Sequence, residues 1–266
     1  MRRNPLATLA LALVTALVFV LLYGPIFIPI ATSFFQVKYG VVDWSQTTLS
    51  AYTRLPENES VIEAVENTFI VGLSAVAASL VLGTLVALHC NSGKSRARSL
   101  LQFIVFLPFL MPPIITGLSL LIFFRETNID RSMLTIIIGH TVFVLALVYR
   151  TILVRLQGIG FSMIEASYDL GASAPQTFFY VLLPNLKSAL IGAGVLAFAL
   201  SFDETMITIL VTGTQNTLPI RLWAMMRLGF TPDINALVAI ILVLTTILVL
   251  VTARFLIPKD FAGAEA

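Results

Sequence analysis

The sequence predicts an all-α membrane protein with six transmembrane helices. Of its 266 residues, 58% are hydrophobic and only 11% are charged, whereas an ordinary soluble domain has about 25% charged residues. Windows of about 20 residues with almost no charge recur along the chain, and this length crosses a hydrocarbon core of about 30 Å as a helix. They cover residues 6–34, 65–88, 100–124, 133–153, 186–211 and 234–257 of a single domain, 1–266.

The first window determines how the chain enters the membrane. Arg2 and Arg3 precede it, but its apolar run is much longer than the region of about 7–15 residues in a cleavable signal peptide. We therefore expect an uncleaved first span. Six spans place both termini on one side, and a cytoplasmic side puts most Lys and Arg residues inside, as topology rules prefer. The inner set is Arg2, Arg3, Lys94, Arg96, Arg98, Arg150, Arg155, Lys187, Arg254 and Lys259; the outer set is Lys38, Arg54, Arg125, Arg131, Arg221 and Arg227.

The third window contains prolines that a regular helix does not tolerate. Pro108, Pro112 and Pro113 each remove a backbone donor and crowd the carbonyl four residues back, and Gly117 follows. Broken helices occur in membranes where protein or a water-filled cavity satisfies the freed groups. The segment therefore predicts either a kinked helix that lines a translocation path or a purely structural kink.

An acidic pair interrupts the fifth window. Asp203 and Glu204 are adjacent, so on a regular helix their carboxylates point about 100° apart and cannot face one point unless the helix unwinds. One carboxylate can face a water-filled cavity and attract a cationic solute while the other pairs with an Arg or a backbone donor. Alternatively, both are solvated at the outer interface. The candidate solute-path residues are Ser201, Asp203, Glu204 and Thr205.

The segment 212–237 is too amphipathic for a simple loop. It contains Trp223 and two methionines beside Arg221 and Arg227. An interfacial helix would bury the Trp and Met side chains and leave both arginines in water. The segment could also fold back as a gate, formed by Arg221, Trp223 and Arg227.

Other signals argue against several classes of site. The single Cys90 excludes an internal disulfide, and no Cys or His cluster has the spacing of metal ligands. Gly93-Lys94-Ser95 resembles the end of a phosphate-binding loop, but position 88 is Leu rather than the required Gly, so we expect no nucleotide site in this chain. His140 lies within the fourth window and is either functional or held by hydrogen bonds to a neighbouring helix.

A polar segment, residues 160–184, lies between the fourth and fifth windows on the expected cytoplasmic side. A short helix is predicted around Glu165 to Leu170. Gly171 permits a sharp turn or a close backbone approach, the chain restarts at Ala174-Pro175, and Pro184 opens the next span. Such a helix suits docking into a groove of a soluble partner, whose movement would then move the adjoining spans as a rigid body.

The spacing of this segment carries a resemblance. Glu165-Ala166-Ser167, three residues, Gly171, nine residues, Val181, one residue and Leu183-Pro184 closely resemble the EAA loop of ABC-importer membrane subunits. Ser167 replaces the usual Ala and Val181 the usual Ile. The proline-rich third window, the acidic pair and the segments 217–227 and 231–239 are similar to the second permease subunit of spermidine/putrescine-type importers.

The resemblance implies a type I ABC-importer permease fold with a cytoplasmic EAA coupling helix in the bacterial inner membrane. It also implies a related second permease, two cytoplasmic ATPase subunits that hold ATP and Mg, a periplasmic solute-binding protein, and no enzymatic activity in this chain. The ATPase-coupling residues would be Glu165, Ala166, Ser167, Gly171, Leu183 and Pro184.

The function implied is import of a polyamine or another small cationic or zwitterionic amine, with Asp203 and Glu204 in the solute path. Relatives carry two Asp residues at the acidic pair, where this chain has Asp then Glu. The alternatives are an importer of the same class for a betaine-like or amino-acid-like solute, and an ion-coupled secondary transporter. A secondary transporter favours paired internal repeats, and an intramembrane enzyme requires a nucleophile-base or metal set within the spans; the sequence shows neither.

Overall fold

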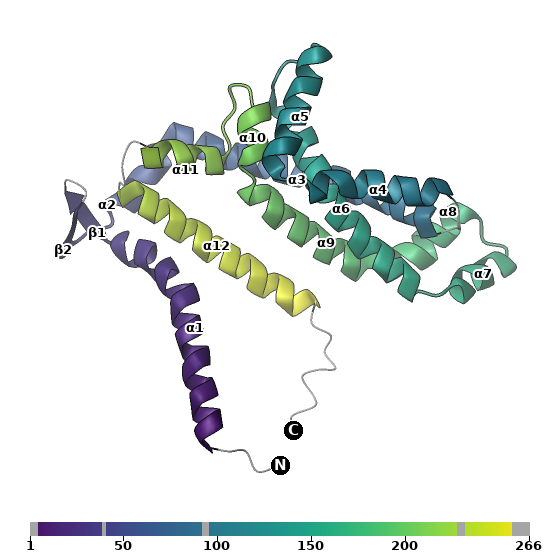
Figure 1. Cartoon of the computed structure of the whole chain (residues 1–266), viewed down its shortest axis with the longest axis horizontal. Coiled ribbons are helices and arrows are strands. Elements are labelled where there is room, and N and C mark those ends of the chain that lie inside the picture. The colour runs from purple at the N-terminus through teal and green to yellow at the C-terminus, as the bar shows by residue number, and fades with distance from the viewer. Residues whose placement is uncertain (1–4, 39–40, 92–95, 228–231, 257–266) are drawn as a thin grey trace. The chain divides into compact units, whose positions relative to one another are not determined.

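A computed structural model of the chain describes residues 5–38, 41–91, 96–227 and 232–256 (Figure 1). The chain divides into two compact units. The first comprises Met1–Ile62 with Leu222–Leu250, and the second comprises Glu63–Arg221 with Val251–Ala266. The second unit holds the polar segment 160–184 and the acidic pair, so it contains both main candidate sites.

The first unit begins with a long apolar helix, α1 (Pro5–Thr32). A short antiparallel hairpin follows, β1 (Phe35–Lys38) and β2 (Val41–Thr47), which the all-α prediction did not include. Its aromatic rings pack together, with 5.0 Å between the ring centroids of Phe35 and Trp44. The chain then turns through α2 (Ser50–Arg54) and η1 (Leu55–Glu57).

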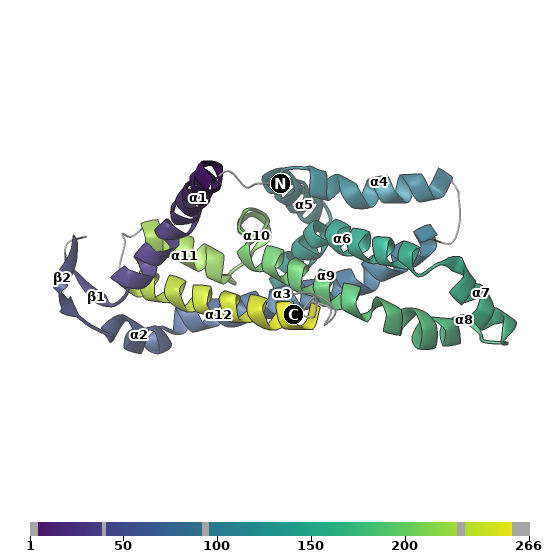
Figure 2. The same ribbon diagram turned by 90° about the horizontal axis from the view of Figure 1, so that it is seen from below.

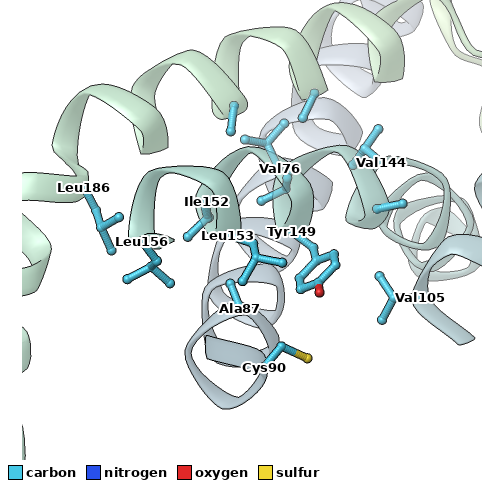
Figure 3. Packing of buried hydrophobic residues seen from close by; sticks show 14 of the residues in the cluster. Val76, Ala87, Cys90, Val105, Val144, Tyr149, Ile152, Leu153, Leu156 and Leu186 are labelled. Carbon is cyan, nitrogen blue, oxygen red and sulfur yellow. The ribbon is translucent and has the colours of Figure 1, made fainter. Parts of the chain in front are cut away.

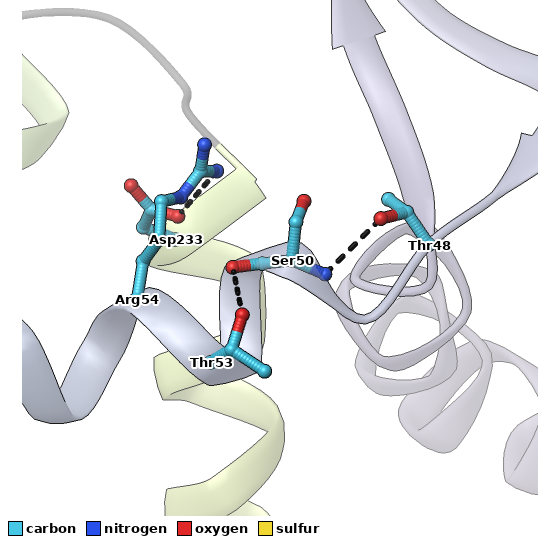
Figure 4. Close-up of polar contacts among 5 residues, drawn as sticks. All are labelled: Thr48, Ser50, Thr53, Arg54 and Asp233. Carbon is cyan, nitrogen blue, oxygen red and sulfur yellow. Dashed lines mark hydrogen bonds and ion pairs between the residues drawn. The ribbon is translucent and has the colours of Figure 1, made fainter.

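Two further helices of this unit lie late in the sequence: most of α11 (Leu218–Arg227) and α12 (Pro232–Leu256). Arg54 joins α2 to the start of α12 by an ion pair with Asp233, 3.0 Å between Nη2 and Oδ1 (Figure 4). The two side chains are 54% and 31% exposed. Pairs this exposed contribute about 1 kcal/mol or less, so this contact adds little to stability.

The second unit is built on nearly all of α3 (Glu59–Asn91) and on α6 (Met133–Gly158) and α9 (Leu183–Asp203). α6 begins with a capping box, in which the Ser132 amide donates to the Thr135 hydroxyl at 2.9 Å. α6 and α9 lie side by side in both views (Figures 1 and 2). The small residues Ala146, Ala193 and Ala197 are fully buried in the core that these helices share, which permits their close approach.

A core cluster lies along α6, with contributions from α3, α4 (Arg96–Leu110) and α9 (Figure 3). Tyr149, Ile152, Leu153 and Leu156 follow one face of α6 at helical spacing, and each is at most 2% exposed. In a membrane span such burial stabilises through van der Waals packing between helices, because lipid tails are as apolar as these side chains. This cluster therefore makes α6 the central helix of the unit.

The third predicted span is broken. α4 (Arg96–Leu110) and α5 (Pro113–Glu126) meet at Met111 and Pro112 and are bent by 108°. Pro112 and Pro113 have no amide hydrogen to donate, so α4 ends before them, as the sequence indicates. The Thr116 hydroxyl donates to the Pro108 carbonyl at 3.2 Å and satisfies part of the broken ladder. The window 100–124 is thus a broken span or a re-entrant loop rather than one straight helix.

The fifth predicted span starts earlier than expected. α8 (Ala174–Gln176), the π-helical stretch η2 (Thr177–Leu182) and α9 form one helical run, Ala174–Asp203. Pro184 therefore does not open the span but lies inside this run. A proline cannot donate to the carbonyl four residues back, and π-helical turns rearrange the hydrogen bonds around such a gap. The Asn185 side chain adds a hydrogen bond to the Val181 carbonyl at 2.7 Å.

The described residues contain four helices long and apolar enough to cross a membrane: α1, α3, α6 and the run Ala174–Asp203. The bent pair α4 and α5 supplies a fifth if it counts as one span. The sixth predicted span falls on α12, a helix of 25 residues, which is about 37 Å long at 1.5 Å per residue. The apolar stretch Pro232–Ile247 within it is shorter than the 18 residues required of a candidate span. Arg2, Arg3, Lys259 and the predicted end of this span at 257 lie outside the described residues.

Candidate functional site

The polar segment contains the short helix that the sequence predicts, α7 (Phe161–Asp169). It is bounded by two glycines in the left-handed region, Gly160 with φ of 72° and Gly171 with φ of 84°. The Gly171 amide donates to the Tyr168 carbonyl at 2.8 Å, and the next amide, of Ala172, donates to the Ser167 carbonyl at 3.0 Å. A Cβ at Gly171 would meet nothing within 4 Å. Within this chain, Gly171 serves the sharp turn and not a close backbone approach.

Ser167 connects α7 to the helix that follows. Its side chain is 8% exposed, and its hydroxyl donates to the Ile164 carbonyl at 2.7 Å. The single hydroxyl hydrogen is then used, so the 2.9 Å contact between Ser167 Oγ and Thr177 Oγ1 is a hydrogen bond donated by Thr177. The Ser167 that replaces Ala in the EAA pattern therefore ties α7 to η2, a contact that no local sequence signal indicates.

The other predicted coupling residues lie on the surface of this chain. Glu165, Ala166 and Pro184 are exposed, and Leu183 is half-buried. Large apolar side chains around them are also exposed: Leu170 88%, Tyr180 79%, Phe179 58%, Tyr168 49% and Met163 44%. The segment thus presents carboxylates together with uncovered apolar groups, the composition of a docking surface.

The acidic pair lies at a break in the helix. α9 ends at Asp203, and α10 (Met206–Val211) begins three residues later. Glu204 between them is extended, with φ of −72° and ψ of 113°. The helix therefore unwinds at this point, so helix geometry does not fix the angle between the two carboxylates.

The two carboxylates have different surroundings. Glu204 is 8% exposed, and its Oε1 accepts a hydrogen bond from the Ile207 amide at 2.9 Å. Asp203 is exposed, and the Thr205 hydroxyl donates to its backbone carbonyl at 3.2 Å. Of the other predicted path residues, Ser201 is buried at 2% exposure and Thr205 is half-buried. The structure therefore brings Asp203 to the surface and uses Glu204 internally.

His140 joins this region from α6. The ring is 1% exposed, and its Nδ1 lies 2.7 Å from Ser201 Oγ while its Nε2 lies 2.7 Å from Thr208 Oγ1. The sequence shows an ionisable residue within a span but contains nothing that indicates these two partners. His140 is thus held by hydrogen bonds on both sides of the break.

The loop between α10 and α11 is tied to α3. The Asn67 side chain donates to the Asn216 carbonyl at 3.0 Å, and the Leu218 amide donates to the Thr68 hydroxyl at 2.7 Å. Gly213 lies against the Arg131 carbonyl so closely that a Cβ would overlap it. These polar residues of α3 were not among the predicted site residues, although they hold the chain that leaves the acidic pair.

The predicted gate residues lie along α11. Trp223 is 46% exposed, and the Arg227 guanidinium carbon lies 5.6 Å from the centroid of its ring. Arg221 is half-buried, and its Nε is buried with no hydrogen-bond partner among the described residues. Arg227 is exposed as expected, whereas Arg221 does not lie freely in water.

No group of three or more Asp, Glu, His and Cys side chains among the described residues is placed to hold a metal ion. Gly93, Lys94 and Ser95 lie outside the described residues.

Comparison with known proteins identifies the family. The model of the family described as "Binding-protein-dependent transport system inner membrane component" matches residues 79–258. The chain is 31% identical over 244 residues to the spermidine/putrescine transport system permease protein PotC of Escherichia coli, covering 91% of each chain. It is 34% identical over 232 residues to the putrescine transport system permease protein PotI of the same organism, covering 84% of this chain and 82% of PotI.

Among solved structures, a bacterial alginate ABC transporter in complex with an alginate pentasaccharide-bound periplasmic protein contains a similar chain. The TM-score is 0.70 at 18% identity, covering 94% of this chain and 92% of that chain. This likeness shows a shared fold and confirms the predicted importer-permease architecture. The chain is therefore a multi-pass permease of a bacterial ABC importer and belongs to the family of inner membrane components of binding-protein-dependent transport systems.

Proposed function

We propose that this permease forms half of the path of an ATP-driven importer for a polyamine or another small cationic or zwitterionic amine. The related PotC and PotI are named for spermidine and putrescine transport. These solutes carry positive charge, and a carboxylate within a membrane path attracts cations. The proposal for the solute depends on the acidic pair rather than on the names alone.

One observation carries the proposal: Asp203 is exposed at a helix break, while its neighbour Glu204 is hydrogen-bonded inside the protein. Discontinuous helices supply solute sites in transporters because unwound backbone and nearby side chains face the path. The exposed Asp203 carboxylate offers its acceptor oxygens to a passing ammonium group. Asp203 is thus the contact for the solute, with Thr205 beside it.

The coupling proposal rests on the segment 160–184. α7 stands between two spans, α6 and the run Ala174–Asp203, and exposes Glu165 beside Leu170. A cytoplasmic ATPase subunit that grips this helix would move both spans, because Ser167 and Thr177 fasten α7 to the second of them. This explains how a chain without a proposed nucleotide site of its own is powered by ATP and Mg on partner subunits.

The proposed assembly contains a second, related permease, two cytoplasmic ATPase subunits and a periplasmic solute-binding protein. The exposed apolar side chains along α1, such as Leu11 at 69% and Val20 at 66%, require cover by lipid or by another helix. Both termini face the cytoplasm in this arrangement, which places α7 on the same side as the ATPases. Arg221, Trp223 and Arg227 on α11 form a proposed gate.

Reconstitution tests the proposal against its alternatives. This chain, its partner permease and the ATPase subunits would be placed in liposomes, and uptake of labelled spermidine, putrescine, a betaine and an amino acid measured with the binding protein present. We expect polyamine uptake that requires ATP and the binding protein. The matched control lacks only the ATPase subunits. Uptake driven by an ion gradient in that control would indicate a secondary transporter, and ATP-driven uptake of only the betaine or amino acid would contradict the solute class.

A further inference from the structure

The hydrogen bonds of His140 reach both sides of the break at the acidic pair. Ser201 is on α9, before Asp203, and Thr208 is on α10, after Glu204. Each hydroxyl lies 2.7 Å from a different nitrogen of the same imidazole. The ring comes from α6, so one side chain of a central helix holds the ends of two others.

A continuous helix could not make these contacts. Residues seven apart on an α-helix are separated by about 10 Å along its axis. Two hydrogen bonds of 2.7 Å and the width of one imidazole ring span less than that. The ring can therefore hold both hydroxyls only when the chain turns between Ser201 and Thr208.

The hydrogen bonds continue from Thr208 to the acidic pair. The Thr208 hydroxyl donates to the Glu204 carbonyl at 2.8 Å. Its single hydrogen is then used, so His140 donates from Nε2 to Thr208 and accepts at Nδ1 from Ser201. The imidazole thus serves as one donor and one acceptor. Glu204 accepts two hydrogen bonds from α10, one at its backbone carbonyl from Thr208 and one at Oε1 from Ile207.

Helix α10 also fits closely against two glycines. A Cβ at Gly117 on α5 would lie 3.0 Å from the Ile207 Cα, and a Cβ at Gly139 on α6 would lie 2.8 Å from the Ile207 Cγ2. Ile207 is fully buried as a result. Gly139 immediately precedes His140, so the same turn of α6 receives Ile207 and binds Thr208.

We propose that His140 is a positioning residue that fastens α9 and α10 across the break and thereby directs the Asp203 carboxylate outward. With Glu204 held by α10 and Ser201 held by the ring, Asp203 is the acid at the break that remains exposed. The consequence for transport rests on the proposed function of Asp203. The fastening of α9 to α10 by His140 does not depend on that function, and it can be tested without any solute.

Thiol accessibility tests the fastening directly. Cys90, the single cysteine, is replaced by Cys90→Ala, and Ile207→Cys or Ala146→Cys is introduced in the assembled transporter. Both positions are 0% exposed, but Ala146 lies in the core of α6, whereas Ile207 lies on α10. We expect neither cysteine to react with a small charged methanethiosulfonate. Adding His140→Leu should make the cysteine at 207 reactive and leave the one at 146 unreactive.

The other outcomes overturn the proposal. An unreactive cysteine at 207 in the His140→Leu background would show that α10 is held without the ring. Reactivity at both positions would show that His140 supports the whole helix packing and has no specific role at the break. If His140→Leu does not assemble, Ser201→Ala and Thr208→Val replace it, because each removes one arm and keeps the ring. Unreactive cysteines at 207 in both would equally overturn the proposal.

Transport kinetics test the consequence for Asp203. His140→Gln retains one donor and one acceptor, whereas His140→Leu retains neither. We expect His140→Leu to raise the KM for polyamine uptake about tenfold, and His140→Gln to raise it less. Ser201→Ala should add little to His140→Leu because both remove the hydrogen bond between the ring and Ser201. A fall in maximal rate with unchanged KM would contradict positioning. If instead Asp203→Asn leaves KM unchanged while the thiol result holds, the proposed function fails and the fastening stands.

Discussion

The Glu204 carboxylate accepts a hydrogen bond from the Ile207 amide, 2.9 Å between Oε1 and N. Ile207 is in the first turn of α10, where backbone amides have no partner within the helix. Glu204 therefore caps a helix, and this internal role separates it from Asp203 only one residue away.

Replacing Glu204 should distinguish capping from solute contact. Glu204→Gln retains an oxygen that can accept from Ile207, whereas Glu204→Ala retains none. We expect Glu204→Ala to destabilise the complex by about 0.5–2 kcal/mol, as lost caps do, and Glu204→Gln to change stability and polyamine KM little. Melting of the purified complex and initial uptake rates measure the two effects. A KM for Glu204→Gln raised as far as that for Asp203→Asn would show that both acids contact the solute.

The turn after α7 should depend on glycine. Gly171 has φ of 84°, and a side chain in this left-handed region costs about 1–2 kcal/mol. We expect Gly171→Ala to shift α7 and lower solute-stimulated ATP hydrolysis by the assembled complex. Gly158→Ala is the matched control, because a Cβ there meets nothing within 4 Å and Gly158 does not have a positive φ. Equal stimulation in the two variants would disprove the coupling role of this turn.

The contact between α7 and η2 predicts an order of effects. Ser167→Ala removes the acceptor of the Thr177 hydroxyl, which is then a buried donor without this partner. Such a loss costs about 1–3 kcal/mol. Thr177→Val should cost less, because Ser167 still donates to the Ile164 carbonyl. Melting temperatures of the purified complexes provide the comparison, and a lower value for Thr177→Val than for Ser167→Ala would refute the assigned donor direction.

The loop after α10 leaves no space for a side chain at Gly213. A Cβ would overlap the Arg131 carbonyl oxygen, which belongs to the backbone and cannot rotate away as a flexible side chain could. We expect Gly213→Ala to destabilise by about 1–3 kcal/mol, as overpacking does, and to reduce the maximal uptake rate. Gly158→Ala again serves as the control. Wild-type melting and uptake for Gly213→Ala would mean that the loop does not pack against Arg131.

Local sequence patterns located much of this architecture. The uncharged windows predicted α1 and α6 closely, and the prolines at 112 and 113 marked the bend of 108° between α4 and α5. Gly171 and the polar residues before it predicted the short helix α7. These features depend on residues that are near one another in the chain, and helix lengths and breaks are determined by such local chemistry.

Other features depend on distant residues and carry no local signal. The hydrogen bonds from His140 to Ser201 and Thr208 cross more than 60 positions, with separations of 61 and 68. The hairpin at 35–47 was missed because its polar and aromatic residues resemble an ordinary loop. The run Ala174–Asp203 was predicted to begin late because Pro184 suggests a helix start, whereas π-helical turns continue the helix around it.

Uptake by an Asp203→Asn transporter tests the central claim most directly. The matched control is Asp130→Asn, which replaces another exposed aspartate that belongs to neither α9 nor α10. Both would be compared with wild type in reconstituted, ATP-driven uptake of spermidine or putrescine, with the amount of complex measured in parallel. Loss of one charged contact predicts a KM raised about tenfold or more for Asp203→Asn and an unchanged KM for Asp130→Asn. Equal KM values for the two variants and wild type would contradict a path in which Asp203 contacts the cationic solute.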